Sequence, residues 1–284
     1  MIMKDFASGQ VRSQLMSLFK AGALLAFALH ASAEDAKLTQ RPFQVALGMF
    51  TNSSDVTIRA DGVSTGGTTI DWDSTFGDIE GTRARLDAYW RITDRHHVRF
   101  MYTDNSSRHQ TVLDRDIEWN GETIPVNATV TSEFGFSVAE VAYEYDFSKS
   151  EDRELVLSAG LHYTRFHADL TGTYTTPGGG GTATVGSEAT VAAPLPVIGA
   201  RGMWNLGGNW WLDGQVQYFQ ITFGDVDGSL LNYRGSVLWQ PRKWFGIGAG
   251  YDSFGVDVDV NGDRFAGALD WTYSGPQLFF SVAF

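Results

Sequence analysis

The last eight residues constrain the fold of this chain more than any other segment. In Gln277–Phe284, every second residue is apolar: Leu278, Phe280, Val282 and Phe284. Side chains alternate between the two faces of a β-strand, so this pattern predicts a strand with one wholly apolar face. In a bilayer such a strand is used when the last strand of a sheet pairs with the first and leaves no open edge. The pattern therefore predicts a closed transmembrane β-barrel.

The beginning of the chain supports export to the envelope. An apolar run at 21–29 follows Lys20 and precedes Ala31-Ser32-Ala33, a small-residue cleavage site. The run is too short to span a bilayer as a helix, so residues 1–33 are expected to be a signal peptide. Residues 34–42 are then a short periplasmic segment, and residues 43–284 form the barrel in the cell outer membrane.

Composition excludes several function classes. The chain has no cysteine, so neither disulfides nor thiol chemistry is expected. Its net charge of −12 makes nucleic acid an unfavourable partner. We expect no cofactor. The acidic side chains are expected in the loops, where they keep the loops solvated or hold divalent cations near lipopolysaccharide.

Alternating hydrophobicity divides the chain into ten expected strands. Polar connections are short at 93–96, 148–152, 206–209 and 241–243, and longer at 51–81, 112–129 and 177–186, as in bacterial barrels with short periplasmic turns. The expected fold is all-β, an antiparallel up-and-down transmembrane barrel. Eight or twelve strands remain open alternatives, because 56–59 and 68–72 could form an additional hairpin, which we interpret as external.

The final strand changes phase. Leu269, Trp271 and Tyr273 are apolar at odd positions, whereas the apolar positions after Ser274-Gly275-Pro276 are even. One extra residue there would restore a single lipid-facing side, because a one-residue slip exchanges the two faces. A β-bulge at 274–276 is therefore expected, with Trp271 and Tyr273 facing outward.

The same terminal residues resemble a known family feature. Gram-negative outer-membrane barrel proteins end in an amphipathic strand with a terminal Phe. The resemblance implies that Phe280, Val282 and Phe284 form a signal read by the barrel assembly machinery. It also implies outer-membrane lipid and lipopolysaccharide as surroundings.

The inward positions of the expected strands carry many charges, which we expect to form a network in the lumen. The network comprises Arg85, Asp87, Arg91, Arg99, Glu140, Glu144, Arg201, Asp213 and Arg234. Charges in a narrow interior must be paired or hydrated. Barrels of about eight to ten strands have interiors largely filled by side chains, which favours a salt-bridged plug over a polar path for solutes.

Candidate catalytic residues are few. His167 and Asp169 lie toward the outer end of one expected strand, and Asp71 and Asp73 lie in the first external loop. An acidic pair facing a His/Asp pair at the mouth of a ten-stranded barrel is similar to the arrangement in omptin proteases, which use it to activate water. His96 and His97 are expected to be solvated in a periplasmic turn.

Two further segments have a local explanation and a functional one. Asp257, Asp259, Asn261 and Asp263 resemble the start of a calcium loop, but position twelve is Ala268 instead of Glu, and Asn-Gly also predicts a hairpin. The turn therefore explains these residues best, and no metal is assigned.

Pro194 and Pro196 each remove a backbone donor from an expected strand. They indicate either a loosened rim above the lipid or a lateral gap. Certain lipid-processing barrels resemble the second arrangement.

The sequence therefore predicts a barrel with a plugged lumen that serves envelope integrity, surface interaction or limited solute passage. The alternative is a lipid- or peptide-processing barrel enzyme.

Overall fold

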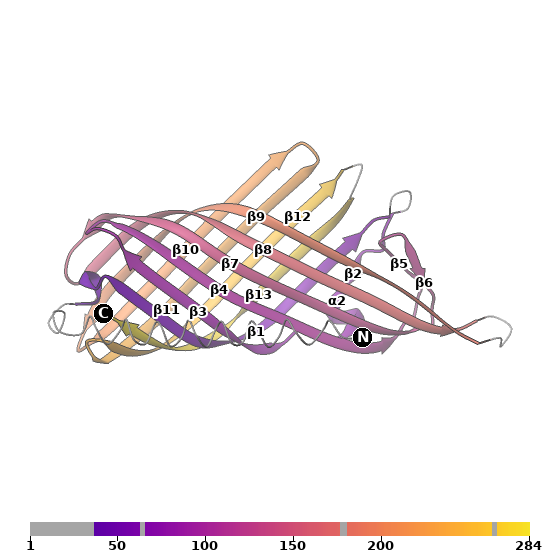
Figure 1. Cartoon of the computed structure of the whole chain (residues 1–284), viewed down its shortest axis with the longest axis horizontal. Coiled ribbons are helices and arrows are strands. Elements are labelled where there is room, and N and C mark those ends of the chain that lie inside the picture. The colour runs from indigo at the N-terminus through magenta and orange to yellow at the C-terminus, as the bar shows by residue number, and fades with distance from the viewer. Residues whose placement is uncertain (1–36, 63–65, 177–180, 263–265) are drawn as a thin grey trace, which may run out of the picture.

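A closed ring of antiparallel strands forms the body of the protein (Figure 1). The computed structural model describes residues 37–62, 66–176, 181–262 and 266–284, so the expected signal peptide lies outside the described residues. Each strand of the ring pairs with its neighbour along the chain, and the last pairs with the first. Within the described residues, no helix is long and apolar enough to cross a membrane.

Ten strands make up the ring, and the remaining elements lie at its two ends. The ring strands are β1 (Phe43–Ala60), β3 (Gly81–Arg91), β4 (His96–Val112), β7 (Thr129–Lys149), β8 (Arg153–Thr175), β9 (Thr182–Gly207), β10 (Trp210–Phe223), β11 (Val226–Arg242), β12 (Phe245–Asn261) and β13 (Ala266–Ala283). The other elements are the 3-10 helix η1 (Leu38–Gln40), β2 (Ile70–Asp71), α2 (Trp72–Phe76), β5 (Ile117–Trp119) and β6 (Glu122–Ile124). The hairpin expected within 56–72 is the short pairing of β2 with the outer end of β1, so it adds no strand to the ring.

Exposed aromatic side chains mark two levels on the outside of the ring. The inner level, toward the short turns, comprises Trp90, Tyr143, Tyr145, Trp204, Trp210, Trp239 and Trp244. The outer level comprises Tyr102, Tyr163, Tyr218, Tyr233 and Tyr251. Such girdles flank the lipid-facing band of outer-membrane barrels. Trp210 and Tyr218 are eight residues apart on β10, which corresponds to roughly 20 Å of membrane at about 3.3 Å per residue and a tilt of about 40°.

The terminal residues close the ring as the sequence predicts. The Phe43 amide donates to the Phe284 carbonyl at 3.0 Å, the Phe284 amide donates to the Phe43 carbonyl at 2.9 Å, and the two rings stack. Leu278 and Phe280 face outward, and Val282 pairs in register with Val45 on β1. The apolar face of β13 therefore lies on the lipid side beside the seam.

The inner mouth of the ring is covered by the N-terminal segment. Leu38 of η1 is buried against Met203, Trp211, Leu238 and Ala283 inside the ring. The hydroxyl of Thr39 donates to the Glu151 carbonyl at 2.7 Å, and Lys37 pairs with Asp152 at 2.9 Å. Both contacts join η1 to the turn between β7 and β8, so the segment is fixed across the mouth.

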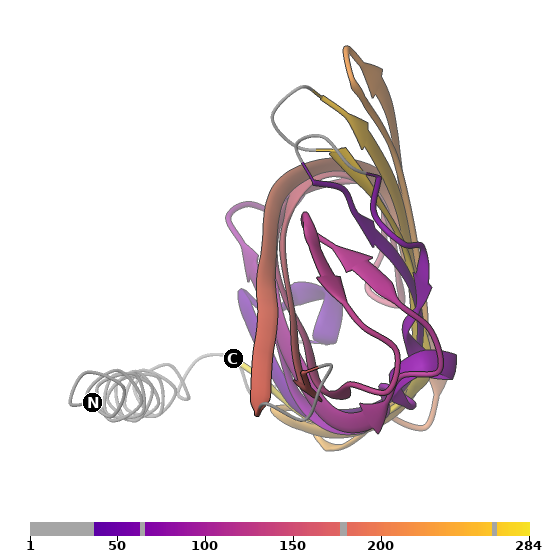
Figure 2. The same ribbon diagram turned by 90° about the vertical axis from the view of Figure 1, so that its right-hand side faces the viewer.

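The outer half of the ring encloses an apolar cluster, which we call the outer core. Its largest buried members come from β7, β12, β13, α2 and the β5–β6 hairpin: Phe134, Phe136, Phe254, Trp271, Tyr273, Trp72, Phe76 and Trp119. Figure 2 shows the β5–β6 hairpin lying across the mouth of the ring at this end. The external loops therefore fold inward and fill the barrel from the outer side.

The expected bulge at 274–276 is wrong. The pairings of β13 with β1 and with β12 keep one register throughout that region. Trp271 and Tyr273 instead point inward, where both contact Phe136 of β7 across the lumen. The apolar phase changes because the strand leaves the lipid: its apolar side chains then belong to the outer core, and its polar side chains face water.

Candidate functional site

A belt of alternating charges crosses the inner half of the lumen. We call it the charge belt, and its members are Asp252, Arg85, Asp87, Arg234, Asp213, Arg201, Glu144, Arg99 and Glu140, each in contact with the next. The separations include 2.9 Å for Arg85–Asp87, 2.8 Å for Arg234–Asp87, 2.7 Å for Arg201–Asp213 and 2.9 Å for Arg99–Glu144. Seven strands contribute side chains, so the belt ties together walls that are not neighbours in the ring.

The belt ends at His162, which lies where the two halves of the lumen meet. Its Nε2 is 3.4 Å from Glu140 and 3.3 Å from the side-chain oxygen of Gln217. The amide of Gln217 donates to Glu140 at 2.6 Å, which satisfies part of that buried carboxylate. The His162 ring also stacks on Phe254 of the outer core. These contacts explain His162 as a structural residue that joins the charge belt to the outer core.

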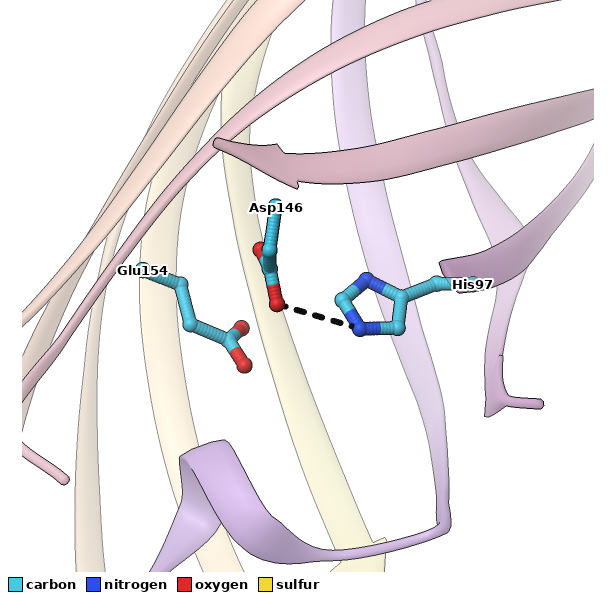
Figure 3. A group of neighbouring side chains, drawn as sticks. All are labelled: His97, Asp146 and Glu154. Atoms are coloured by element: carbon cyan, nitrogen blue, oxygen red, sulfur yellow. Dashed lines mark ion pairs between the residues drawn. The ribbon is translucent and has the colours of Figure 1, made fainter. Parts of the chain in front are cut away.

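A second buried cluster surrounds Arg91 near the inner mouth. His97, Asp146 and Glu154 converge there, and His97 Nε2 lies 3.2 Å from Asp146 (Figure 3). Their side chains have the donor types and proximity of a metal site. However, Arg91 pairs with Asp146 at 3.3 Å and with Glu154, and its Nη1 also contacts His97. The guanidinium already supplies the positive charge that these groups require, which disfavours a metal ion.

The structure places all nine residues of the expected lumen network inside the ring, in two groups. Eight belong to the charge belt, and Arg91 forms the separate cluster. Two buried carboxylates were not included in the expected network: Asp252 of the charge belt and Glu154 of the Arg91 cluster. The alternation of side chains along each strand could have identified both. Glu154 is an even number of residues from His162 and so shares its inward face of β8, and Asp252 shares the inward face of β12 with Phe254 and Val256.

The expectation that His97 is a solvated turn residue is wrong. It is the second residue of β4 and is fully buried beside Tyr89 and Arg91. Residues 93–97 are all polar, which suggested a longer turn, but β4 already begins at His96. His96 remains partly accessible and contacts Tyr143 at the inner girdle.

The candidate catalytic residues are not assembled. His167 and Asp169 lie on the outer face of β8, because their neighbours Phe166, Ala168 and Leu170 occupy the inner face in the outer core. His167 contacts Glu188 at 3.3 Å and Thr190 at 3.1 Å, both on β9. In the part of the chain that the structure describes, no hydrogen bond or ion pair joins either residue to Asp71 or Asp73.

Asp71 and Asp73 have structural partners instead. Asp71 caps α2 by accepting from the Ser74 amide at 3.0 Å. The carboxylate of Asp73 accepts from the Val56 and Ile79 amides at 3.0 and 3.1 Å. Burial raises the pKa of Asp73, and these two amide hydrogen bonds act against that shift. Asp73 therefore fixes the first external loop to β1, and each of its two carboxylate oxygens accepts from a backbone amide.

A serine and a histidine that the sequence interpretation did not pair lie together on β4. The hydroxyl of Ser107 is 2.7 Å from His109 Nε2, on the inward face near the outer mouth. A hydrolytic site also needs a group that orients the histidine. Among the described residues, no carboxylate contacts His109, so this pair lacks the third member of a triad.

The two prolines on β9 lie just beyond the point where β9 stops pairing with β10. Pairing of β9 with β10 runs from Gly207 to Ile198 and ends there, although β9 continues beside β8 as far as Thr182. The pairing with β8 continues through Pro194 and Pro196 without a register shift. The Asn205 amide donates to the Asp152 carbonyl on the side of β8, and backbone donors of an antiparallel strand point alternately to its two neighbours. The donors missing at Pro194 and Pro196 therefore lie on the other edge, facing β10. Above Ile198 the β10–β11 hairpin rises away from β8 and β9 (Figure 1).

The calcium-like segment lies on the β12–β13 hairpin. Asn261 pairs in register with Ala266, as a hairpin requires, and Asp263 lies outside the described residues. Asp259 pairs with Arg59 at 3.8 Å and contacts Asn261, whereas Asp257 faces Asp270 directly across the strands. Burial raises the pKa of Asp257, and the nearby Asp270 and Asp259 carboxylates raise it further.

Comparisons with known proteins place the fold but not a family. No protein-family model matches the sequence, and no curated protein does. The outer-membrane protease OmpT of Escherichia coli superposes with a TM-score of 0.54 at 9% identity, over 87% of this chain and 98% of that one.

Two other solved structures match less well. The toluene transporter TodX of Pseudomonas putida has a TM-score of 0.34 at 8% identity, over 86% of this chain and 90% of that one. Neisserial surface protein A has a TM-score of 0.30 at 14% identity, over 86% of this chain and 97% of that one. The closed ring of the structure and the likeness to OmpT confirm the ten-stranded barrel expected from the sequence, so the chain has the fold of the bacterial outer-membrane β-barrel proteins.

Proposed function

We propose that this protein is a closed barrel that serves the cell envelope and its outer surface instead of passing solutes through its lumen. One observation carries the proposal: the interior is filled at three successive levels. Leu38 covers the inner mouth, the charge belt crosses the inner half, and the outer core fills the rest. In a narrow barrel whose charged side chains pair with one another, no water-filled path lined by free charges is left for solutes.

The wall beyond the lipid supports a role at the surface. β7, β8 and β9 continue well past the outer girdle residue Tyr163, as far as Thr129, Thr175 and Thr182. Membrane anchoring does not require this length. Its outward side chains are largely polar, including Glu133, Arg165, Asp169, Glu188 and Thr190. A stiff, polar sheet held above the bilayer is suited to contact with other surface molecules.

Planar-bilayer recording tests whether the lumen is closed. The refolded protein should show no steady conductance at neutral pH. A stable, large open state would contradict the proposal and favour a porin-like role.

A second experiment separates the wall from the barrel. A variant that lacks residues 171–186, which include the paired outer ends of β8 (171–175) and β9 (182–186), should still fold, as judged by heat-modifiable migration on a gel. In a strain lacking the protein, wild type should restore resistance to detergent and the shortened variant should not. Equal restoration would place the role in the membrane-spanning barrel alone.

A second candidate function is supported by the separation of β9 from β10. An acyl chain of an outer-leaflet lipid could enter between these strands, because the pairing ends beside the outer girdle residue Tyr218. Leu195 and Val197, which line the inner face of β9 there, are buried and apolar. This arrangement would suit a lipid-processing barrel, and hydrogen exchange at the two strand edges tests it.

A further inference from the structure

The outer end of β9 has one edge that no strand covers. β9 pairs with β8 as far as Thr182, but its pairing with β10 ends at Ile198, and within the described residues no other strand pairs with β9 on that side. β10 itself ends at Phe223, and in the same register it would reach only Ala193. β8 and β9 thus extend beyond β10 (Figure 1). We call this side of residues 182–192 the free edge.

The free edge carries backbone groups that are available for pairing. The Asn205 amide donates toward β8, so odd-numbered amides of β9 face β8 and even-numbered amides face the free edge. One carbonyl there, that of Glu188, accepts from the side chain of Asn120 at 3.4 Å. The exposed residues whose amides face the free edge are Thr184, Gly186, Glu188, Thr190 and Ala192.

The free edge lacks the features that usually prevent a strand from adding to a sheet. Exposed edges are commonly protected by proline, by charges, by bulges or by short length. Residues 182–192 contain no proline and one charged residue, and they pair with β8 without a register shift. Pro194 and Pro196 lie directly below, where Pro194 pairs with the outer girdle residue Tyr163. The prolines therefore protect the edge beside the lipid, and the segment above them can still pair.

Charges on the outward face indicate what an added strand should carry. Glu133, Asp169 and Glu188 stand directly opposite one another on β7, β8 and β9, so three carboxylates form a row that ends at the free edge. Like charges that face one another across strands are unfavourable. At the far end of the row, Arg108 lies 4.0 Å from Glu133. At the free edge, Glu188 contacts the His167 ring at 3.3 Å, and no described Arg or Lys pairs with it. A cation on the added strand would balance this end.

We propose that the free edge binds an extended segment of another surface protein, which adds a strand to the sheet. Its apolar side chains lie beside Val185 and Ala189, which pack against the outer core, and alternate with polar ones that include Lys or Arg opposite Glu188. This inference rests on the proposed surface role and specifies the partner. A second copy in the same membrane does not fit, because its β9 also runs from outside to inside and two such edges cannot pair antiparallel.

The probe is a decapeptide of alternating Lys and Val, titrated into the refolded protein in zwitterionic nanodiscs at constant ionic strength. It should bind saturably at one site. A peptide of the same composition with all Lys before all Val should bind about tenfold more weakly, because it cannot place its apolar side chains on one face. On binding, the even-numbered amides of Thr184, Glu188 and Thr190 should exchange more slowly, measured by NMR, whereas odd-numbered amides already paired with β8 should not change.

Methylation of the peptide backbone tests the pairing without altering the protein. Residues that face each other in a hydrogen-bonded antiparallel pair exchange both of their N–H bonds, so the peptide residues opposite Thr184 and Glu188 donate to β9. These are the Lys residues, since their side chains face outward. N-methylation of every Lys should abolish binding. N-methylation of every Val, whose N–H groups lie on the far edge, is the matched control and should preserve it.

A protein variant tests the same edge from the other side. Thr184→Pro combined with Thr190→Pro removes two donors from the free edge alone, as Pro194 and Pro196 already do below. It should migrate as a folded barrel and bind the alternating peptide about tenfold more weakly, since two backbone hydrogen bonds are lost. Thr184→Ala combined with Thr190→Ala loses the same hydroxyls but keeps both amides, so its affinity should be unchanged.

Several results would overturn the assignment. Absence of saturable binding, or equal binding of the two methylated peptides, would show that the edge does not accept a strand. Self-association of the protein that the proline variant abolishes would assign the edge to a second copy. If deletion of 171–186 removes detergent resistance and the proline variant restores it fully without binding the peptide, the surface role stands and the free edge has no part in it.

Discussion

The two halves of the lumen are built on opposite principles. In the inner half, inward side chains are charged and outward side chains are apolar, because lipid surrounds the wall. In the outer half, inward side chains such as Trp271 and Phe136 are apolar, and outward ones are polar, because water surrounds the wall. The same strands run through both halves without a change of register. The solvent outside each segment thus determines which side chains fill its interior.

This contrast explains why Trp271 and Tyr273 were misplaced by alternation alone. Alternation reports which residues share a face, but it does not report which face is in contact with lipid. We assumed that the apolar face of β13 points outward along its whole length. That assumption holds from Pro276 to the end of the strand and fails above it.

The largest effect is expected from Trp271→Ala in the outer core. Trp271 is fully buried among Phe136, Phe166, Phe254 and Tyr273, so its removal leaves a large cavity. We expect the free energy of unfolding to fall by about 4 kcal/mol, measured by urea titration in lipid vesicles. Val112→Ala is the control: Val112 is exposed at the outer end of β4, and its truncation should cost less than about 0.5 kcal/mol.

The same variant sharpens the comparison between the halves. Trp271→Ala should remain non-conducting in planar bilayers, because the charge belt still closes the inner half. A channel opened by this substitution would show that the outer core, and not the belt, seals the lumen.

The next effect is expected from Glu140→Ala in the charge belt. Removal of this carboxylate leaves Arg99 with one partner, Glu144, and removes the acceptor beside His162. Loss of one partner of a buried pair should cost about 3 kcal/mol in the same urea titration.

Glu133→Ala is the matched control for that experiment. Its carboxylate pairs with Arg108 at 4.0 Å on the exposed outer wall, where an ion pair contributes less than about 1 kcal/mol. If the two variants lower the free energy of unfolding equally, the ion pairs of the belt are exposed to water and are not buried.

A smaller, local effect is expected where the two halves meet between β9 and β10. Amides of β10 beyond Tyr218 that face β9 should exchange with deuterium faster than amides of β4 between Val98 and Tyr102, because pairing with β9 ends at Ile198. Replacing Pro194 and Pro196 with Val restores two donors on that edge and should slow the exchange. Exchange as slow as in β4, or no response to the double replacement, would exclude a lateral gap.

The smallest effect concerns the acidic hairpin of the outer half. Asp257 and Asp270 face each other, and burial together with the neighbouring carboxylates raises the pKa of Asp257. A carboxyl group with a raised folded-state pKa disfavours folding above that pKa, and this cost is absent below its unfolded pKa. Asp270→Asn should therefore slow hydrogen exchange of the hairpin slightly at pH 7 and have no effect at pH 3. An equal effect at both pH values would exclude repulsion as the cause.

Much of the inner half was predictable, and little of the outer half was. Where the strands cross the lipid, side chains alternate between the lumen and the lipid, so sequence position alone separates belt residues such as Arg85 and Glu140 from girdle residues such as Trp90. The partners of each charge were not predictable, because they depend on which walls face one another across the ring. The outer core was missed because Trp72 and Trp119 lie in external loops, whose inward folding no local pattern indicates.

The filled lumen also limits the order in which the molecule can be assembled. The loop segments 61–80 and 113–128 supply Trp72 and Trp119 to the outer core, on the far side of the charge belt from the periplasm. Once the belt has formed, no peptide segment can pass through the ring. Both loops must therefore cross the membrane before the charges of the belt pair across the ring, so that pairing of the belt is one of the last events in the biogenesis of the protein.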